Sequence, residues 1–251
     1  MRQEQIIHGI HAVQASLEYD RDHLMEVYRD KERTDRRLEA LLLELKQAGV
    51  EIHKASRREL DKLAGGERHQ GIVARVLVPP TLGEKELMQL LDALDGPPLL
   101  LVLDGVTDPH NLGACLRTAD AVGVQAVITP KDNSVGLTAT ARKVSSGAAE
   151  TVPFVQVTNL SRTLEQLKEA EFWTVGLDGE GKDSMDTLEW PARAVLVLGA
   201  EGKGLRRLTR ENCDFLVRIP MTPAMESLNL SNAAAIALYE SYRQRAVNKK
   251  K

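Results

Sequence analysis

Five polar residues have the side-chain types needed to hold a substrate for group transfer. They are Asn111, Arg117, Glu201, Ser227 and Asn229, and each follows an apolar stretch. Amides and hydroxyls orient bound groups through hydrogen bonds, a guanidinium binds phosphate, and a carboxylate accepts N–H groups. No Ser-His-Asp set and no metal-ligand cluster accompanies them, which argues against a nucleophilic triad and against metal-assisted hydrolysis. Taken singly, each residue also fits an ordinary structural role.

The first polar segment begins a helix. Asp108 suits the N-cap and Pro109 the first helical position. Free N–H groups at such a helix start attract anions. Asn111 and Arg117 are six residues apart and so do not share one helical stripe, although both can flank the same loop. Without further context, Asn111 is a helix-start residue and Arg117 is a solvated charge.

The second polar segment, 199–204, contains three glycines in six residues. Glycines let backbone N–H groups approach a ligand closely. The spacing is not that of a dinucleotide-binding fingerprint, which needs G-x-G-x-x-G after a first strand. A second glycine pattern, at 176–182, matches a phosphate-binding loop except that Asp183 replaces the Ser or Thr that would hold magnesium, so a nucleoside triphosphatase is rejected.

The third polar segment, 227–231, precedes a helix with small residues at its start. Serine and asparagine at such a position usually cap the helix, so Ser227, Asn229 and Ser231 can all be explained as caps. The alanines at 233–235 allow the helix to pack closely against a neighbour.

A regular alternation of strands and helices positions these segments. Apolar stretches predict strands at 99–103, 126–128, 152–157, 173–177, 194–198 and 215–219. Helices are predicted at 84–94, 111–122, 139–145, 160–170, 205–211 and 230–246. Continuous apolar strands separated by helices are typical of a parallel sheet covered on both faces. Because ligands of such sheets bind beyond the carboxyl ends of the strands, the polar segments are expected at the binding edge.

The N-terminal part has its own, shorter alternation of strands and helices, which predicts a small α/β unit. The consecutive prolines that follow Val78 break this pattern. We therefore predict an N-terminal domain at 1–78, a linker at 79–83 and a C-terminal domain at 84–251.

The composition restricts the class of protein. With 251 residues, 43% of them hydrophobic, the chain is an ordinary globular protein. No apolar run approaches the roughly 20 residues of a membrane span, and the N-terminus has no signal-like pattern, so a cytoplasmic protein is expected. The two cysteines, Cys115 and Cys213, are expected to be buried thiols, and no metal site is expected.

Any nucleic-acid site must be a local patch, because the net charge is −3. The candidate patches are Arg57-Arg58, Arg68-His69-Gln70, Arg142-Lys143, the group Arg206, Arg207 and Arg210, and the tail Arg243, Arg245 and Lys249–Lys251. Each of them, taken singly, can equally be a solvated helix face. Aromatic residues are only 4%, which argues against a base-stacking platform.

Together, the three polar segments resemble the three signature motifs of the SpoU (TrmH) family of SPOUT methyltransferases. They stand in the family's order, and each follows a strand. The resemblance continues in the N-terminal unit, where 7–13 and 69–72 are similar to the substrate-binding domain of family members that methylate ribosomal RNA.

This resemblance implies a function that spacing alone does not give. It implies a methyl transfer from S-adenosylmethionine (AdoMet) to the ribose 2′-hydroxyl of a guanosine in 23S ribosomal RNA, by a homodimer. It implies a deep trefoil knot in the C-terminal domain, an exception to the usual absence of knots, and an L30e-like N-terminal RNA-binding domain. The positions that match the family's methyl-donor site are Gly199, Ile219 and Leu228, and those that match its catalytic site are Asn111, Arg117, Glu201, Ser227 and Asn229.

The third motif departs from the family at two positions: Pro223 stands where a glycine is usual, and Glu226 where an apolar or small residue is usual. In the family's proposed mechanism Arg117 is the base, yet a guanidinium stays protonated in proteins. We therefore expect Arg117 to contact a phosphate and position the hydroxyl, or to lose its proton only transiently. Two alternatives remain open: a tRNA ribose methyltransferase, and a non-enzymatic RNA-binding factor that keeps the fold.

Overall fold

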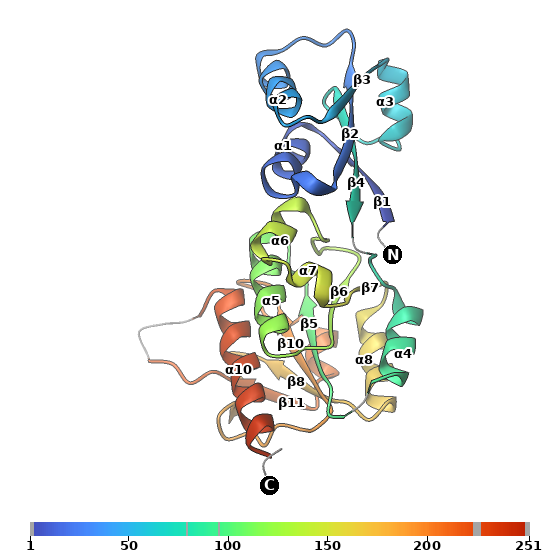
Figure 1. Ribbon diagram of the computed structural model, residues 1–251. Coiled ribbons are helices and arrows are strands. Elements are labelled where there is room, and N and C mark those ends of the chain that lie inside the picture. The colour runs from blue at the N-terminus through green and yellow to red at the C-terminus, as the bar shows by residue number, and fades with distance from the viewer. Residues whose placement is uncertain (1–2, 79, 95, 223–226, 249–251) are drawn as a thin grey trace. The chain divides into compact units, whose positions relative to one another are not determined.

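A computed structural model of the chain describes residues 3–78, 80–94, 96–222 and 227–248. Contacts within the chain divide it into two units, Met1–Pro80 and Thr81–Lys251. Both units combine a β-sheet with helices (Figure 1). Among the described residues, no helix is long and apolar enough to cross a membrane. The departures at Pro223 and Glu226 lie outside the described residues.

The N-terminal unit is the small α/β unit that the sequence predicted. Its strands, in the order β1-β4-β2-β3, are β1 (Gln3–His8), β4 (Ile72–Val78), β2 (Leu24–Asp30) and β3 (Glu51–Ala55). The sheet is mixed, because β4 runs antiparallel to both of its neighbours while β2 and β3 are parallel. The helices are α1 (Ile10–Tyr19), α2 (Arg36–Gln47) and α3 (Arg57–Leu63), with a 3₁₀ turn at Arg21–His23.

The C-terminal unit is built on a parallel sheet, as the continuous apolar stretches predicted; six of its seven strands were predicted and the two-residue β9 was not. The sheet order is β7-β6-β5-β10-β8-β11-β9. The strands are β5 (Leu99–Asp104), β6 (Ala126–Pro130), β7 (Phe154–Val157), β8 (Trp173–Leu177), β9 (Asp183–Ser184), β10 (Ala194–Gly199) and β11 (Phe215–Arg218). All residues of β5 and β10 are buried, which is what central strands covered on two faces require.

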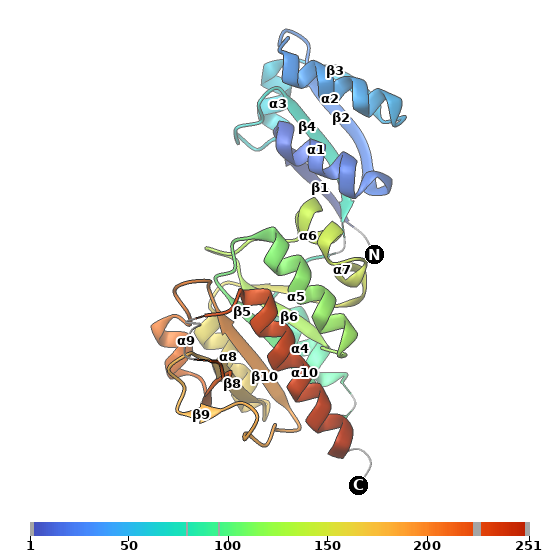
Figure 2. The ribbon, with the colours of Figure 1, turned by 90° about the vertical axis from the view of Figure 1, so that its left-hand side faces the viewer.

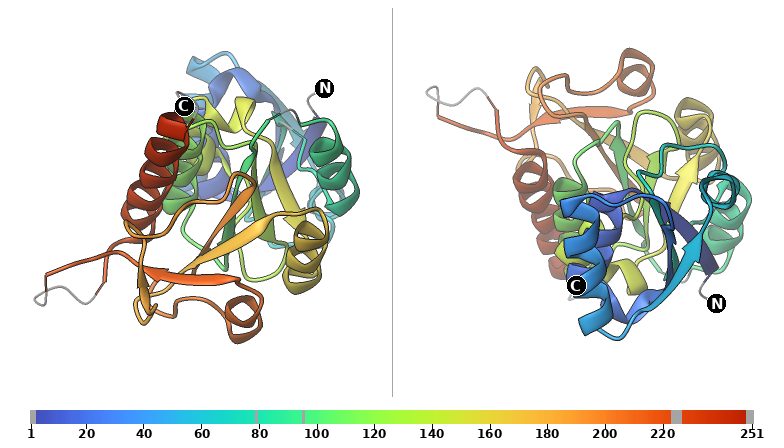
Figure 3. Two further views of the ribbon diagram at one scale, coloured as in Figure 1. Left: turned by 90° about the horizontal axis from the view of Figure 1, so that it is seen from below. Right: turned by 90° about the horizontal axis from the view of Figure 1, so that it is seen from above.

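Helices cover both faces of this sheet. Helices α5 (Pro109–Ala121) and α10 (Leu230–Asn248) pack side by side on one face, and α4 (Glu84–Asp92) and α8 (Leu160–Glu169) cover the other (Figures 1, 2 and 3). Each face has its own apolar core. Leu101, Leu112 and Leu238 belong to the first core, and Leu100 and Leu164 to the second.

The structure corrects the sequence prediction at several short elements. The strand predicted over 152–157 begins only at Phe154, because a short helix, α7 (Ala148–Thr151), ends immediately before it. The helix predicted over 205–211 begins at Arg207 as α9 (Arg207–Glu211). Helix α6 (Ala139–Val144) is capped by the Thr138 hydroxyl. The elements α7 and β9 have four and two residues and leave no periodic pattern in the sequence.

Candidate active site

A cavity of about 400 Å³ opens beyond the carboxyl ends of β8, β10 and β11. We call it the Gly199 pocket. Residues from three segments line it. The first is Leu177–Gly179, the second is Leu198–Gly204 with the exception of Lys203, and the third contributes Ile219, Met221, Ser227, Leu228, Leu230 and Ala233. All three residues expected to hold the methyl donor, Gly199, Ile219 and Leu228, are among the lining residues, and so is Ser227. The second and third predicted segments therefore meet at the edge of the sheet where a parallel α/β fold binds ligands.

Gly199 is required by the close turn that follows β10. A Cβ atom at this position would lie 1.9 Å from the Gly204 carbonyl carbon and 2.2 Å from the Leu205 nitrogen. The turn is closed by two backbone hydrogen bonds, from Ala200 N–H to the Gly204 oxygen at 3.0 Å and from Gly204 N–H to the Ala200 oxygen at 2.9 Å. Glycine at 199 thus lets the 200–204 loop fold back over the strand end and form one wall of the pocket.

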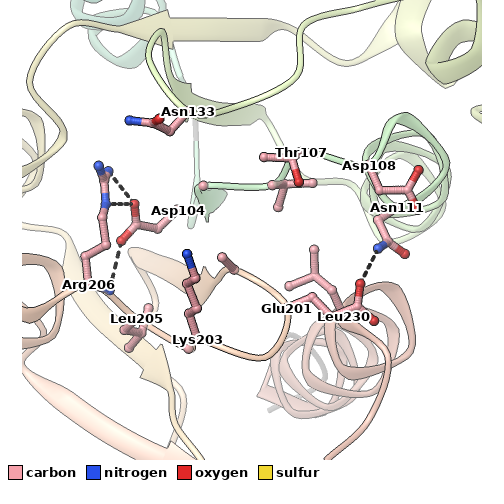
Figure 4. A pocket seen from close by; sticks show the side chains of 14 residues that line it. Asp104, Thr107, Asp108, Asn111, Asn133, Glu201, Lys203, Leu205, Arg206 and Leu230 are labelled. Atoms are coloured by element: carbon pink, nitrogen blue, oxygen red, sulfur yellow. Dashed lines mark hydrogen bonds and ion pairs between the residues drawn. The ribbon is translucent and has the colours of Figure 1, made fainter.

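Three of the five candidate catalytic residues form one hydrogen-bonded network. Asn111 Nδ2 donates to Glu201 Oε2 at 3.2 Å, and Asn229 Nδ2 donates to Asn111 Oδ1 at 3.1 Å and to Glu201 Oε1 at 3.4 Å. Figure 4 shows the Asn111–Glu201 bond, which joins the start of α5 to the loop after β10. Asn111 is buried, whereas Glu201 and Asn229 are exposed. The network links residues that are up to 118 positions apart in the sequence.

Asn229 has the capping role that the sequence offered as one interpretation, and it also takes part in the network. Its side-chain oxygen accepts from the Ser231 N–H at 2.9 Å and from the Ser231 hydroxyl at 2.6 Å, and its carbonyl accepts from the Ala233 N–H. These bonds make Asn229 the N-cap of α10. Its amide nitrogen remains free to reach Asn111 and Glu201, so capping fixes the orientation of the amide in the network.

Arg117 does not join this network. Six residues turn a helix by about 600°, which leaves Arg117 roughly a third of a turn away from Asn111. Arg117 is exposed, has no ion pair or hydrogen bond to any described residue, and does not line the Gly199 pocket. Within one copy of the chain the structure therefore brings together Asn111, Glu201 and Asn229, with Ser227 in the adjoining pocket, and leaves Arg117 apart.

A second cavity, of about 500 Å³, adjoins the first, and we call it the Asp104 pocket. Both cavities are lined by Ala200, Glu201, Gly204 and Leu230, so the two share a wall. Asp104 and Arg206 form an ion pair at one end of it (Figure 4). Sequence reasoning named Arg206 in a basic patch but missed Asp104 and the pairing of the two. The only signal was an aspartate ending the apolar stretch 99–103, where full burial of a carboxylate requires a partner.

The two cysteines have no catalytic features. Burial raises the pKa of the Cys115 thiol to about 12, and burial together with the Asp214 charge raises the pKa of the Cys213 thiol to about 12. Protonated thiols are poor nucleophiles. Cys115 is buried as predicted, whereas Cys213 is only partly buried, so the prediction of a buried thiol is wrong at that position. The described part of the chain contains no group of three His, Cys, Asp or Glu residues that could hold a metal ion.

Two basic patches named from the sequence line one cavity in the N-terminal unit, of about 480 Å³. We call it the His69 pocket, and its cations are Arg33, Arg57 and Arg68. Buried His69 supports its floor, with Nε2 at 3.0 Å from Asp61 Oδ1 and Nδ1 accepting from the Gly71 N–H at 3.1 Å.

The loop 69–71 also anchors the first helix. Gln70 adopts a positive φ of 51°, and its side-chain oxygen accepts from the Ile10 N–H at 3.2 Å. Since Gly9 at the N-cap of α1 provides no side-chain acceptor, Gln70 caps this helix from a distance in sequence. The two N-terminal segments that carried the family resemblance therefore meet in space.

Comparison with known families matches nearly the whole of this architecture. Residues 98–239 match the SpoU rRNA Methylase family, and residues 6–80 match the RNA 2′-O ribose methyltransferase substrate-binding family. The chain belongs to the SpoU family.

Relatives within the SpoU family align over almost the full length. The 23S rRNA (guanosine-2′-O-)-methyltransferase RlmB of Bordetella pertussis is 50% identical over 98% of this chain and 99% of the relative. The proteins of the same name from Yersinia pestis and Pasteurella multocida are 53% and 54% identical, over 97% and 95% of this chain and 98% of each relative.

Solved structures agree on the fold. The SpoU methyltransferase AviRb from Streptomyces viridochromogenes, in complex with AdoMet, has a TM-score of 0.63 at 23% identity and covers 97% of this chain and 91% of its own. A structure described as an RNA 2′-O ribose methyltransferase has a TM-score of 0.59 at 25% identity and covers 97% and 89%.

Proposed function

We propose that this protein transfers the methyl group of AdoMet to the ribose 2′-hydroxyl of a guanosine in 23S rRNA. The observation that carries the proposal is the full-length identity of about 50% to RlmB proteins, together with the Asn111–Glu201–Asn229 network beside the Gly199 pocket. Both the substrate-binding and the methyltransferase parts of the family are present in one chain.

The Gly199 pocket fits the methyl donor. It lies at the carboxyl ends of three parallel strands, and the missing Cβ of Gly199 lets backbone line its wall. Bound AdoMet supplies an electrophilic methyl group on a sulfonium, which is a good leaving group. The protein therefore has mainly to align the two reactants and to take up the hydroxyl proton.

In this proposal the residues of the chain divide the work. Gly199, Ile219 and Leu228 hold the donor. Glu201, fixed by two amides, sets the position of the loop between the two pockets, while Ser227 and Asn111 orient the ribose. Arg117 contacts a neighbouring phosphate and positions the hydroxyl, because its guanidinium stays protonated.

The proposal includes a homodimer. One support is the exposed apolar face of α10, on which Ile236, Tyr239 and Tyr242 are 42%, 59% and 47% exposed. Another support is the position of Arg117, which lies apart from the network of its own copy. In a dimer, Arg117 of one copy would reach the substrate bound at the network of the other copy. Light scattering on the purified protein tests this: we expect a dimer for the wild type and a monomer for Tyr239→Asp, and a monomeric wild type would contradict it.

The proposal also includes the deep trefoil knot implied by the family resemblance. The sheet order supports it, since β10 lies beside β5 although β6, β7, β8 and β9 stand between these two strands in the sequence. A further support is that segments around residues 199–204 and 227–230 line one pocket.

The domain roles and the location in the cell complete the proposal. Residues 1–78 form the RNA-binding domain, with Arg57 and Arg68 at the His69 pocket contacting phosphates of folded rRNA. Residues 79–83 form the linker, and residues 84–251 form the methyltransferase domain. The protein acts in the cytoplasm.

Two measurements test the function. Ribose methylation of 23S rRNA is mapped in cells with and without the gene, and we expect one guanosine to lose its methyl group. If no 23S site changes, the rRNA assignment is wrong, and a lost tRNA site would support a tRNA enzyme instead. Calorimetry with AdoMet then tests the non-enzymatic alternative. We expect AdoMet to bind, whereas an RNA-binding factor without enzymatic activity would show no binding.

A further inference from the structure

The Asp104 pocket lies directly beside the proposed methyl-donor site, and Gly199, Ile219 and Leu228 are not among its lining residues. The two pockets share a wall formed by Ala200, Glu201, Gly204 and Leu230. The Asp104–Arg206 ion pair lies at one end of the Asp104 pocket, and Asn111 lies at the opposite end (Figure 4). In Figure 4, Lys203 extends between the loop after β5 and the loop after β10, with Arg206 and Asn133 beyond it. A group bound here would adjoin both the network and the methyl donor.

Asp104 is a fully buried carboxylate at the end of the central strand β5, with 0% exposure. Arg206 makes three contacts with this carboxylate. The Arg206 backbone N–H donates to Oδ2 at 3.3 Å, Nε donates to Oδ1 at 2.5 Å, and Nη2 forms an ion pair with Oδ1. A buried carboxylate without such partners would be strongly unfavourable.

Only Nε and Nη2 of the Arg206 guanidinium contact Asp104. The Arg206 side chain is 50% exposed, and within the described residues Nη1 has no partner. Since Asp104 holds the guanidinium through Nε and Nη2, the direction of the remaining N–H groups is fixed. A planar, preorganised guanidinium of this kind is suited to phosphate.

Lys203 adds a second cation on the same loop. It is exposed, lines the pocket and has no ion pair to any described residue. The carboxylates of the pocket are all engaged: Asp104 with Arg206, Glu201 with two amides, and Asp108 with the His110 N–H at 2.9 Å. The two cations thus remain available to an anionic ligand.

We propose that the Asp104 pocket binds a backbone phosphate of the RNA next to the target ribose, through Lys203 and Arg206, and that Asp104 is the positioning residue that aims Arg206. The inference rests on the proposed function, because it assumes an RNA substrate. It assigns a role to Arg206, one of the basic residues found in the sequence, and to Asp104, which was not among the candidate site residues.

The experiment measures three quantities: the AdoMet Kd by calorimetry, the KM for an unmodified 23S rRNA transcript, and the salt dependence of RNA binding. The variants are Lys203→Ala, Asp104→Asn, Arg206→Gln and the double variant Asp104→Asn/Arg206→Gln, in which no buried charge is left alone. Arg207→Ala is the matched control, because Arg207 is exposed, lies outside the pocket and pairs with Glu211 on the surface of α9.

We expect Lys203→Ala and the double variant each to raise the KM by about tenfold, as loss of a charged hydrogen bond does. The slope of log K against log salt should fall by about one for each lost cation. The AdoMet Kd should stay within about twofold of wild type. Asp104→Asn alone should also raise the KM, yet it should add nothing in the Arg206→Gln background, since Asp104 acts through Arg206.

Several results would overturn the proposal. An unchanged KM and salt slope in Lys203→Ala and in the double variant would remove the phosphate site. A wild-type KM in Asp104→Asn would show that Asp104 only holds the loop in place. A fall in AdoMet affinity in these variants would show that the carboxylate of the methyl donor occupies the pocket. A wild-type protein that fails to methylate 23S rRNA would instead contradict the proposed function itself.

Discussion

Replacing Gly199 by alanine should weaken binding of the methyl donor. The new Cβ atom would lie 1.9 Å from the Gly204 carbonyl carbon, 2.1 Å from its oxygen and 2.2 Å from the Leu205 nitrogen, whereas real Cβ atoms do not approach below 3.0 Å. All three neighbours are backbone atoms, so no side-chain rotation can relieve the overlap. The 204–205 segment must instead move away by roughly 1 Å, which a close-packed interior does not absorb.

The magnitude follows from what that movement breaks. Overpacking a rigid site costs about 1–3 kcal/mol. The two hydrogen bonds between Ala200 and Gly204 contribute about 0.5–1.5 kcal/mol each. We therefore expect the free energy of unfolding to fall by about 2–6 kcal/mol. Because the displaced loop lines the donor pocket, AdoMet affinity should fall at least about tenfold, corresponding to about 1.4 kcal/mol.

Calorimetry with AdoMet and thermal unfolding give the two readouts. Gly136→Ala is the matched control, since Gly136 has no positive φ, lines none of the described pockets, and its added Cβ would meet only the Gln156 amide nitrogen, at 3.8 Å. The control should keep wild-type affinity and stability. A Gly199→Ala protein with wild-type Tm and wild-type AdoMet Kd would refute the reasoning.

Three further outcomes are expected. Arg117→Ala should abolish methyl transfer to rRNA and leave the AdoMet Kd nearly unchanged, so substantial residual turnover would remove Arg117 from the mechanism. Burial tends to raise the pKa of Asp214, but the Thr174 N–H, Lys168 and the Thr174 hydroxyl outweigh it and lower the pKa. This lowered pKa stabilises the fold above the unfolded pKa of about 3.9. Because Asp214 lies near the surface, where solvent screens its charge, Asp214→Asn should cost only about 0.5–1 kcal/mol at neutral pH in denaturant titrations. This difference should shrink as the pH falls through the folded pKa, and a pH-independent cost would contradict the reasoning. Because burial raises the Cys115 pKa to about 12, this thiol should react with a disulfide reagent at about pH 8 only after unfolding, and fast labelling of the native protein would count against its burial.

Much of the sheet could be predicted, because central parallel strands leave a strong signal. The residues of β5 and β10 are uniformly apolar until the strand ends. The signal fails for short elements: α7 has four residues and β9 only two. Strand β9 pairs with β11, and α7 packs against α5. Local sequence does not encode such contacts.

The site was predictable in its members but not in its contacts. Asn111, Glu201 and Asn229 were each found by position after a strand, yet nothing in their spacing shows that they touch. Asp104 and Arg206 were missed as a pair, since 102 residues separate them. Pairing across such a distance depends on the sheet order, which sets β10 beside β5.

The network itself explains why position 111 carries an amide. Asn111 donates to Glu201 through Nδ2 and accepts from Asn229 through Oδ1, so it needs both a donor and an acceptor. Aspartate has the same shape but would face the Glu201 carboxylate with a second negative charge. Because Glu201 lines both the Gly199 and the Asp104 pockets, fixing its carboxylate fixes their common wall. The amide at 111 therefore couples the geometry of the proposed methyl-donor site to that of the proposed phosphate site.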